Sequence, residues 1–147
     1  MHVGKAKKSF YREAQREYLQ KINKICNIED VIIKDSNKKE IFLQQKENEK
    51  EILNKLDPKD SLILLDERGK LFKSIEFSNF IQKIWKIQKT PCFVIGGPYG
   101  HNESIKQRAQ HLISLSPLTF THDLAYILLL EQIYRALTII IKHPYHH

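Results

Sequence analysis

Helical and strand-like hydrophobic patterns alternate along the whole chain. Apolar residues recur at helical spacing from Phe10 to Ile25, which predicts a first helix over about residues 9–26. The short apolar runs Ser61–Leu65 and Cys92–Ile95 are typical of strands covered on both faces. The same patterns predict strands at residues 30–34 and 114–115, and helices over residues 37–56, from 74 to before 91, 102–112 and from 121 to about 141. This alternation predicts an α/β fold, a mainly parallel sheet sandwiched by helices.

Length and composition indicate a single domain over residues 1–147. Hydrophobic residues make up 41% and charged residues 28%, and five Gly and five Pro are too few for a long linker. Cys26 and Cys92 form neither a metal-binding spacing nor a disulfide framework, which favours a reducing cytoplasm. The first ten residues contain no apolar signal-peptide region. The longest apolar window, Leu124–Ile141, has charged residues near its middle, so we expect no membrane span.

The net charge of +7 points towards a polyanionic partner. Part of this excess is concentrated in and just before the first predicted helix. In residues 5–24 only Glu13 and Glu17 oppose seven basic residues: Lys5, Lys7, Lys8, Arg12, Arg16, Lys21 and Lys24. A basic helix face of this kind is typical of nucleic-acid binding, although a merely solvated face has the same composition. Charge alone therefore leaves both interpretations open.

Three loops follow the predicted strands and are candidates for a ligand site. They are Leu65–Gly69, Gly96–Gly100 and Leu115–Phe120, and ligands of parallel sheets bind where such loops converge at the carboxyl ends of the strands. The glycines of Gly96–Gly100 allow close approach of backbone to a flat ligand, or simply a tight turn. The segment is not a dinucleotide fingerprint, because Pro98 and the spacing break that motif and no phosphate-binding lysine follows.

Five ordered strings resemble the ribosomal large-subunit pseudouridine N3-methyltransferases of the SPOUT superfamily. They are LLDERG (64–69), FVIGGPYG (93–100), LISLSPLTFTH (112–122), LLLEQIYRA (128–136) and HPYHH (143–147). The match extends from Val3 to the last residue. The resemblance implies a SPOUT-type α/β fold with a C-terminal trefoil knot, a homodimer, and transfer of methyl from S-adenosylmethionine to N3 of a pseudouridine in 23S rRNA on the assembled ribosome.

The resemblance also implies a cofactor site within the three loops. Carried over by position, S-adenosylmethionine would contact Leu65, Gly96, Leu115, Ser116, Pro117, Leu118, Thr119 and Phe120. A sulfonium cation and an adenine suit a pocket of backbone groups and apolar side chains, and methyl displacement needs no metal. We therefore expect S-adenosylmethionine as cofactor and no metal ion.

The end of the chain supplies the candidate catalytic residues. An imide N3 is protonated at neutral pH, so a group must accept its proton as the methyl arrives. His143, Tyr145 and His146 are the candidates for that role and for positioning the base; a simple helix-end role for the histidines is the alternative. Arg135 is a candidate for contact with substrate phosphate or with the other subunit, against an intrahelical ion pair with Glu131 four residues earlier.

The last predicted helix is apolar on all sides, which predicts a homodimer. One small domain can hardly cover every side of Leu124–Ile141, so we expect part of it to lie against a second subunit. His122, at its start, is expected to be structural.

Two positions depart from the pattern of the family that the chain resembles. Tyr126 and His147 stand where a basic residue is usual in that family, and its members also have most of a strand before the position of Val3.

Three other functions remain as alternatives to this methyltransferase. They are a methyltransferase of another RNA, a non-catalytic RNA- or ribosome-binding protein that retains the fold, and an enzyme using Gly96–Gly100 as a phosphate loop.

Overall fold

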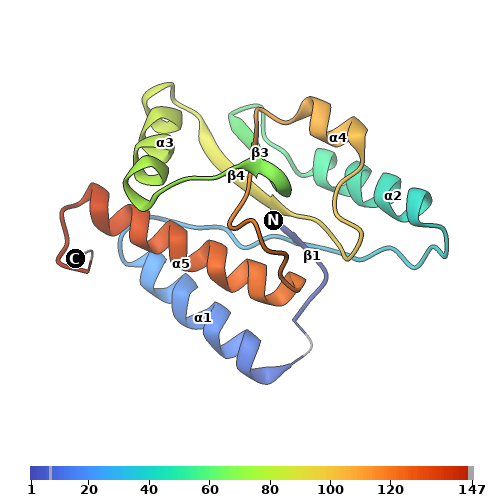
Figure 1. Ribbon diagram of the computed structural model, residues 1–147, viewed down its shortest axis with the longest axis horizontal. Helices are drawn as coiled ribbons and strands as arrows, with labels where there is room; N and C mark the ends of the chain where they lie inside the picture. The colour runs from blue at the N-terminus through green and yellow to red at the C-terminus, as the bar shows by residue number, and fades with distance from the viewer. Residues whose placement is uncertain (7, 146–147) are drawn as a thin grey trace.

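The chain folds into one parallel five-stranded sheet with helices on both faces in the computed structural model, which describes residues 1–6 and 8–145 (Figure 1). In chain order the elements are β1 (His2–Val3), α1 (Ser9–Asn23), β2 (Ile32–Ile33), α2 (Ile41–Asn54), β3 (Asp60–Lys70), α3 (Ser74–Lys86), β4 (Thr90–Ile95), α4 (Glu103–Arg108), β5 (His111–Ile113) and α5 (His122–Ile140). The strand order is β2-β1-β4-β3-β5, and every pairing is parallel. The predicted α/β class is confirmed; the trefoil knot stays a prediction.

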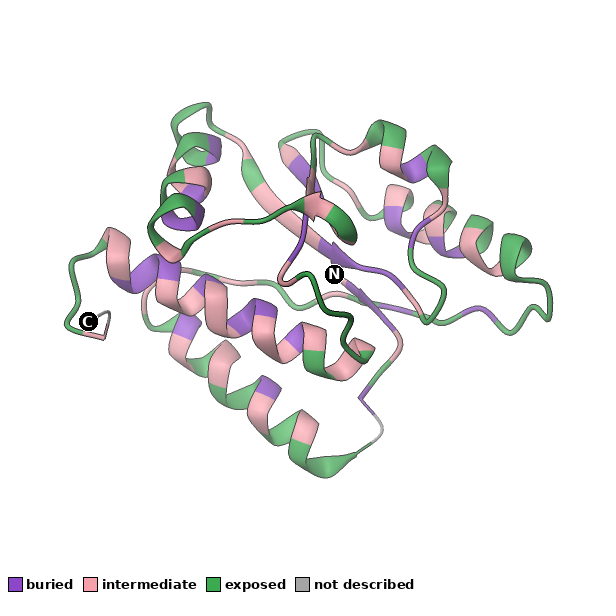
Figure 2. Cartoon of the chain, viewed as in Figure 1, coloured by how far each residue is buried: buried purple, intermediate pink, exposed green. Residues whose placement is uncertain are grey.

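Two hydrophobic clusters hold the helices onto the sheet. On one face, Ile63 and Ile113 of the sheet pack with residues of α1, α3 and α5, such as Ile22, Ile81 and Leu130. On the other face, strand residues such as Leu62 and Leu64 pack with Ile52 of α2 and Ile105 of α4. Alternate residues of β3 therefore serve opposite faces, as the pleat of a strand requires, and burial is concentrated in the sheet and the inner sides of the helices (Figure 2).

The first loop of the predicted site differs from the expected turn. The sequence predicts that the strand ends at Leu65, but β3 continues through the polar residues to Lys70. Its register with β5 shifts at this point, because both Leu65 and Lys70 pair with Ile113. A Cβ atom on Gly69 would lie 2.3 Å from the carbonyl carbon of Ile113. Gly69 is therefore needed for the close approach of β5, not for a turn.

We expect Gly69→Ala to destabilise the protein by about 3 kcal/mol, because the added methyl overlaps the backbone of Ile113 and one strand has to move. Urea unfolding measures this loss. Arg68→Ala changes an exposed neighbour and is the control, for which we expect a change within about 0.5 kcal/mol. Equal midpoints for the two variants would contradict the tight contact between β3 and β5.

Several element ends also differ from the prediction. The second helix begins after Glu40 instead of at Asn37, and the fourth ends at Arg108, so that β5 lies a few residues before the predicted strand at 114–115. The predicted cap at Asn102 is confirmed, since its side chain accepts a hydrogen bond from the backbone N–H of Ile105 at 3.0 Å. None of the helices in the described ranges is long and apolar enough to cross a membrane.

Candidate functional site

The three segments predicted from the sequence line one cavity, which lies beside the middle of β3 and the carboxyl ends of β4 and β5. Its volume is about 200 Å³. β3 contributes Leu65–Glu67, and the start of α5 adds two further residues to the wall. The lining residues are Leu65, Asp66, Glu67, Ile95, Gly96, Gly97, Pro98, Gly100, Ile113, Ser114, Leu115, Ser116, Leu118, Thr119, Phe120, His122 and Ala125. Of the eight predicted cofactor-binding residues, only Pro117 is not among these lining residues.

The loop after β4 is a tight turn, and Gly96 and Gly100 are needed in it for different structural reasons. The backbone N–H of Gly100 donates to the carbonyl oxygen of Gly97 at 2.9 Å, and Gly100 has a φ of +66°, in the left-handed region. A Cβ atom on Gly96 would lie 2.9 Å from the carbonyl carbon of Gly100. The turn folds back on its own first residue, and backbone instead of side chains therefore forms this wall of the cavity.

Serine hydroxyls hold the segment that follows β5. The Ser114 hydroxyl donates to the carbonyl oxygen of Ser116 at 2.8 Å, and the Ser116 hydroxyl accepts from the backbone N–H of Leu118 at 2.9 Å. These bonds leave the Leu118 side chain 73% exposed although it lines the cavity. The two hydroxyls therefore shape the loop, while apolar side chains and backbone groups line the cavity.

The ionisable groups beside the cavity are arranged so that the acid is charged and the histidines are neutral. Burial acts to raise the pKa of Asp66, but its hydrogen bond with Lys106, at 2.8 Å, outweighs this and the net pKa is lowered. Burial lowers the pKa of His101 to about 4 and also lowers the pKa of His122. The cavity wall thus has a carboxylate at neutral pH and no protonated histidine.

The predicted catalytic residues that the structure describes, Arg135, His143 and Tyr145, lie in or beyond the second half of α5. Arg135 donates from Nε and Nη2 to Glu131 Oε1 at 3.0 and 2.7 Å, so the intrahelical ion pair is present. The Tyr145 ring lies 5.0 Å from the guanidinium carbon, and the backbone N–H of Tyr145 donates to His143 Nδ1 at 3.2 Å. His143 is exposed, and His146 lies outside the described residues.

The length of α5 separates these residues from the cavity of the same subunit. His122, at the first residue of α5, lines the cavity, whereas Arg135 lies 13 residues later, about 20 Å along the helix axis. Residues 141–145 follow the end of α5 and lie farther along the chain still (Figure 1). Within one subunit Arg135 therefore lies away from the predicted cofactor loops.

A buried polar cluster behind the cavity was not predicted. Tyr126, where the resemblance implies a basic residue, is 5% exposed, and its hydroxyl donates to Asp30 Oδ1 at 2.6 Å. Its ring stacks on His2 with centroids 4.2 Å apart, and the His2 ring lies 5.9 Å from that of His122. The cluster joins three distant segments of the chain, so no local pattern could have indicated it. Tyr126 supports the start of α5 from inside the fold.

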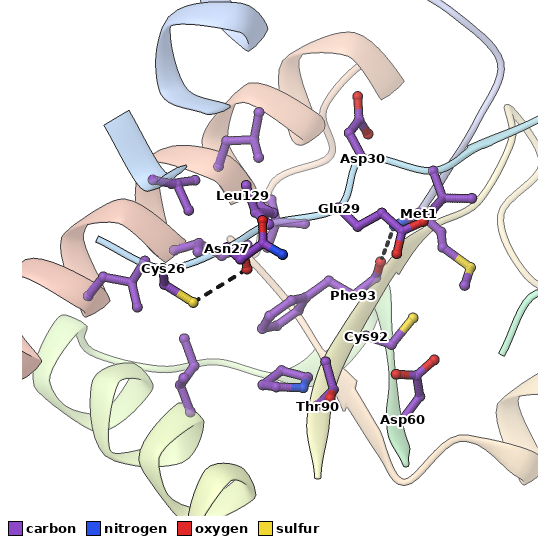
Figure 3. A pocket seen from close by; sticks show the side chains of 18 of the residues that line it. Met1, Cys26, Asn27, Glu29, Asp30, Asp60, Thr90, Cys92, Phe93 and Leu129 are labelled. Atoms are coloured by element: carbon purple, nitrogen blue, oxygen red, sulfur yellow. Dashed lines mark hydrogen bonds between the residues drawn. The ribbon is translucent and has the colours of Figure 1, made fainter. Parts of the chain in front are cut away.

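A second and larger cavity lies at the amino ends of β3 and β4 (Figure 3). Its volume is about 420 Å³, and residues 26–31 and 90–93 form much of its wall. None of the predicted site residues that the structure describes lines it. Because the loops that can carry ligand contacts in a parallel sheet gather at the carboxyl ends, we take the smaller cavity as the candidate site.

Comparison with known proteins identifies the family of this chain. A family model described as a predicted SPOUT methyltransferase matches residues 1–146. The curated proteins named ribosomal RNA large subunit methyltransferase H from Parabacteroides distasonis and Phocaeicola vulgatus are each 42% identical to this chain over 99% of its length and 95% of theirs. The protein of that name from Lawsonia intracellularis is 42% identical over 99% of this chain and 94% of its own. The chain belongs to the SPOUT methyltransferase family.

Proposed function

We propose that this protein methylates large-subunit ribosomal RNA with S-adenosylmethionine as methyl donor, and that its target is N3 of a pseudouridine on the assembled ribosome in the cytoplasm. The names of its relatives support the reaction and the RNA. The observation that carries the proposal is the convergence of three loops, distant in sequence, on one cavity at the carboxyl ends of the strands. SPOUT methyltransferases generally use S-adenosylmethionine.

The chemistry of the cavity wall suits this cofactor. The proposed contacts are Leu65, Gly96, Leu115, Ser116, Pro117, Leu118, Thr119 and Phe120. Apolar side chains from two of the loops can flank an adenine, and the turn at Gly96 offers backbone groups that can bond to its edge. Asp66 is already paired with Lys106, and no lysine or arginine of the described residues lines the cavity. The cavity therefore does not resemble a phosphate site.

The reaction needs positioning and a proton acceptor. The bound cofactor supplies a methyl group on a sulfonium sulfur, and in-line placement of the target nitrogen lowers the barrier most. The N3–methyl bond forms as the sulfur–methyl bond breaks, and the N3 proton must leave to a base. We propose that His143, Tyr145 and His146 position the base and handle this proton, while Arg135 contacts phosphate.

A homodimer would bring these groups to the cofactor. Leu124 and Ile141, near the two ends of α5, are 37% and 50% exposed, and the residues Ile127, Leu128, Ile139 and Ile140 are only half-buried. An apolar helix that is incompletely covered by its own domain favours burial against a second copy. If α5 packs antiparallel to its partner across a two-fold axis, the end of one chain lies beside the cavity of the other.

The proposed reaction predicts one methylated position in ribosomal RNA. Ribosomes that lack the modification, incubated with the protein and labelled S-adenosylmethionine, should acquire label at N3 of a single pseudouridine of the large subunit, which digestion and mass spectrometry can map. Free S-adenosylmethionine should also bind saturably by calorimetry. Label in another RNA would show that this RNA, and not large-subunit ribosomal RNA, is the substrate. Saturable binding of RNA without any cofactor binding would instead indicate a non-catalytic RNA-binding protein.

A further inference from the structure

A row of tyrosines and cations runs from α1 to the end of the chain. The Lys21 ammonium lies 5.2 Å from the Tyr18 ring, and the rings of Tyr18 and Tyr134 are 6.4 Å apart in an edge contact. Tyr134 lies 4.8 Å from Tyr145, which in turn is 5.0 Å from the guanidinium carbon of Arg135. We call these five residues the tyrosine row. It joins two residues of the proposed site, Tyr145 and Arg135, to residues of α1.

Packing between helices does not by itself account for the row. All five side chains are half-buried, so each keeps a part that faces solvent, whereas the contact of α1 with α5 is closed by fully buried residues such as Ile22 and Ile133. Glu131 fixes one end, because it accepts hydrogen bonds from Arg135 and lies 3.5 Å from the Tyr145 hydroxyl. Burial and then Tyr145 and Glu131 raise the pKa of Tyr18, so the phenol is neutral at physiological pH.

The composition of the row matches one kind of ligand. Surfaces that bind single-stranded nucleic acid combine aromatic rings, on which successive bases stack, with cations that follow the phosphates. Bases in loops of folded RNA are unstacked and available for such contacts, and RNA is recognised in this way more often than through paired bases. α1 belongs to the basic segment of residues 5–24. Within the row Lys21 is paired with Glu17 and Arg135 with Glu131, so each cation would exchange a carboxylate for a phosphate on binding RNA.

We propose that the tyrosine row extends the substrate site, so that unpaired bases next to the target nucleotide stack on Tyr18 and Tyr134 while Lys21 and Arg135 meet the neighbouring phosphates. This inference rests on the proposed function and adds Tyr18, Tyr134 and Lys21 to it as substrate-binding residues. None of the three takes part in methyl transfer itself. Their loss should therefore affect binding of RNA and not the chemical step.

Steady-state kinetics with unmodified ribosomes tests this role. Tyr18→Leu keeps an apolar side chain but removes the ring, so we expect KM for ribosomes to rise roughly ten-fold, as for the loss of one stacked base. The kcat and the Kd for S-adenosylmethionine should stay within about two-fold, since the variant leaves the cofactor loops intact. Tyr18→Phe keeps the ring and should restore the KM of the original protein.

Two controls separate stacking from general effects. Tyr11 is also a half-buried tyrosine of α1 but contacts Phe10, outside the row, and Tyr11→Leu should leave KM unchanged. Lys21→Gln should reduce the slope of log KM against log salt by about 0.7, the value for one phosphate contact on a single strand.

The inference is overturned if Tyr18→Leu lowers the melting temperature without changing KM, or if Tyr18→Leu and Tyr18→Phe raise KM equally. An equal rise with Tyr11→Leu would also overturn it. Failure of the proposed function has a different signature, because the original protein would then methylate no RNA. The measurement of cofactor binding on the free protein distinguishes the two outcomes.

Discussion

Mixing two inactive variants of this protein, Gly96→Val and Arg135→Ala, should restore methyl transfer that neither variant has alone. Gly96→Val blocks the cofactor loop, since even a Cβ atom there lies 2.9 Å from Gly100. Arg135→Ala removes the cation at the far end of α5. In the proposed dimer each site takes its cofactor loops from one subunit and its C-terminal residues from the other. A mixed dimer therefore contains one site with both parts intact.

The expected recovery is about a quarter of the original activity, because about half of randomly exchanged dimers are mixed and each has one intact site of two. Arg135→Ala mixed with Tyr145→Ala is the matched control. Both changes lie at the same end of α5, so no hybrid site is complete and no recovery is expected. Absence of recovery with Gly96→Val, when mass spectrometry shows mixed dimers of folded subunits, would place the complete site within one chain.

Stability should fall steeply as the pH drops from 6.5 towards 4. His101 is 7% exposed, Nε2 of its ring has no hydrogen-bond partner, and burial lowers its pKa to about 4. The unfolded chain therefore binds a proton at His101 below about pH 6.5, while the folded chain does so only near pH 4. The stabilisation is fully present above pH 6.5 and is lost across this window, by about 3 kcal/mol in total.

Urea unfolding at a series of pH values measures this effect. His101→Leu cannot bind the proton, so its free energy of unfolding should change less between pH 7 and 4.5. The change that remains belongs to groups such as His122 and His111, whose pKa burial also lowers. His143→Ala removes an exposed histidine and is the control, for which we expect the same pH dependence as in the original protein. Asp66 has its pKa lowered and loses its ion pair with Lys106 only below its ordinary range, so it does not obscure the histidine window. An unchanged slope in His101→Leu would assign the acid sensitivity to other groups.

Much of the fold and of the candidate site follows from local sequence. The apolar runs around Ile63 and Val94 predicted buried parallel strands because both of their faces are covered by helices. Once strands are parallel and adjacent, their carboxyl ends share one edge of the sheet, so the loops after them had to converge. The location of the candidate cavity could be predicted for this reason, and the resemblance to relatives selected the same loops.

The errors and omissions concern contacts between distant segments. β3 passes through Asp66–Gly69 as a strand although these residues are typical of a turn, because pairing with β5 at Ile113 outweighs local preference. Likewise Tyr126 appeared only as a missing basic group, whereas contacts with His2 and Asp30 make it part of the interior. Such pairings depend on the packing of several elements, which a hydrophobic pattern does not encode.

By itself the sequence determined the α/β class, the family and the loops of the candidate site. Those properties depend on periodicity, on glycine and proline positions, and on short motifs, all of which are local. Only the tertiary structure decided that Gly69 lies against β5, that Tyr126 contacts His2 and Asp30, and that tyrosines of α1 join the C-terminal residues. These are contacts between residues that are far apart in the chain, and packing of the helices and strands sets them.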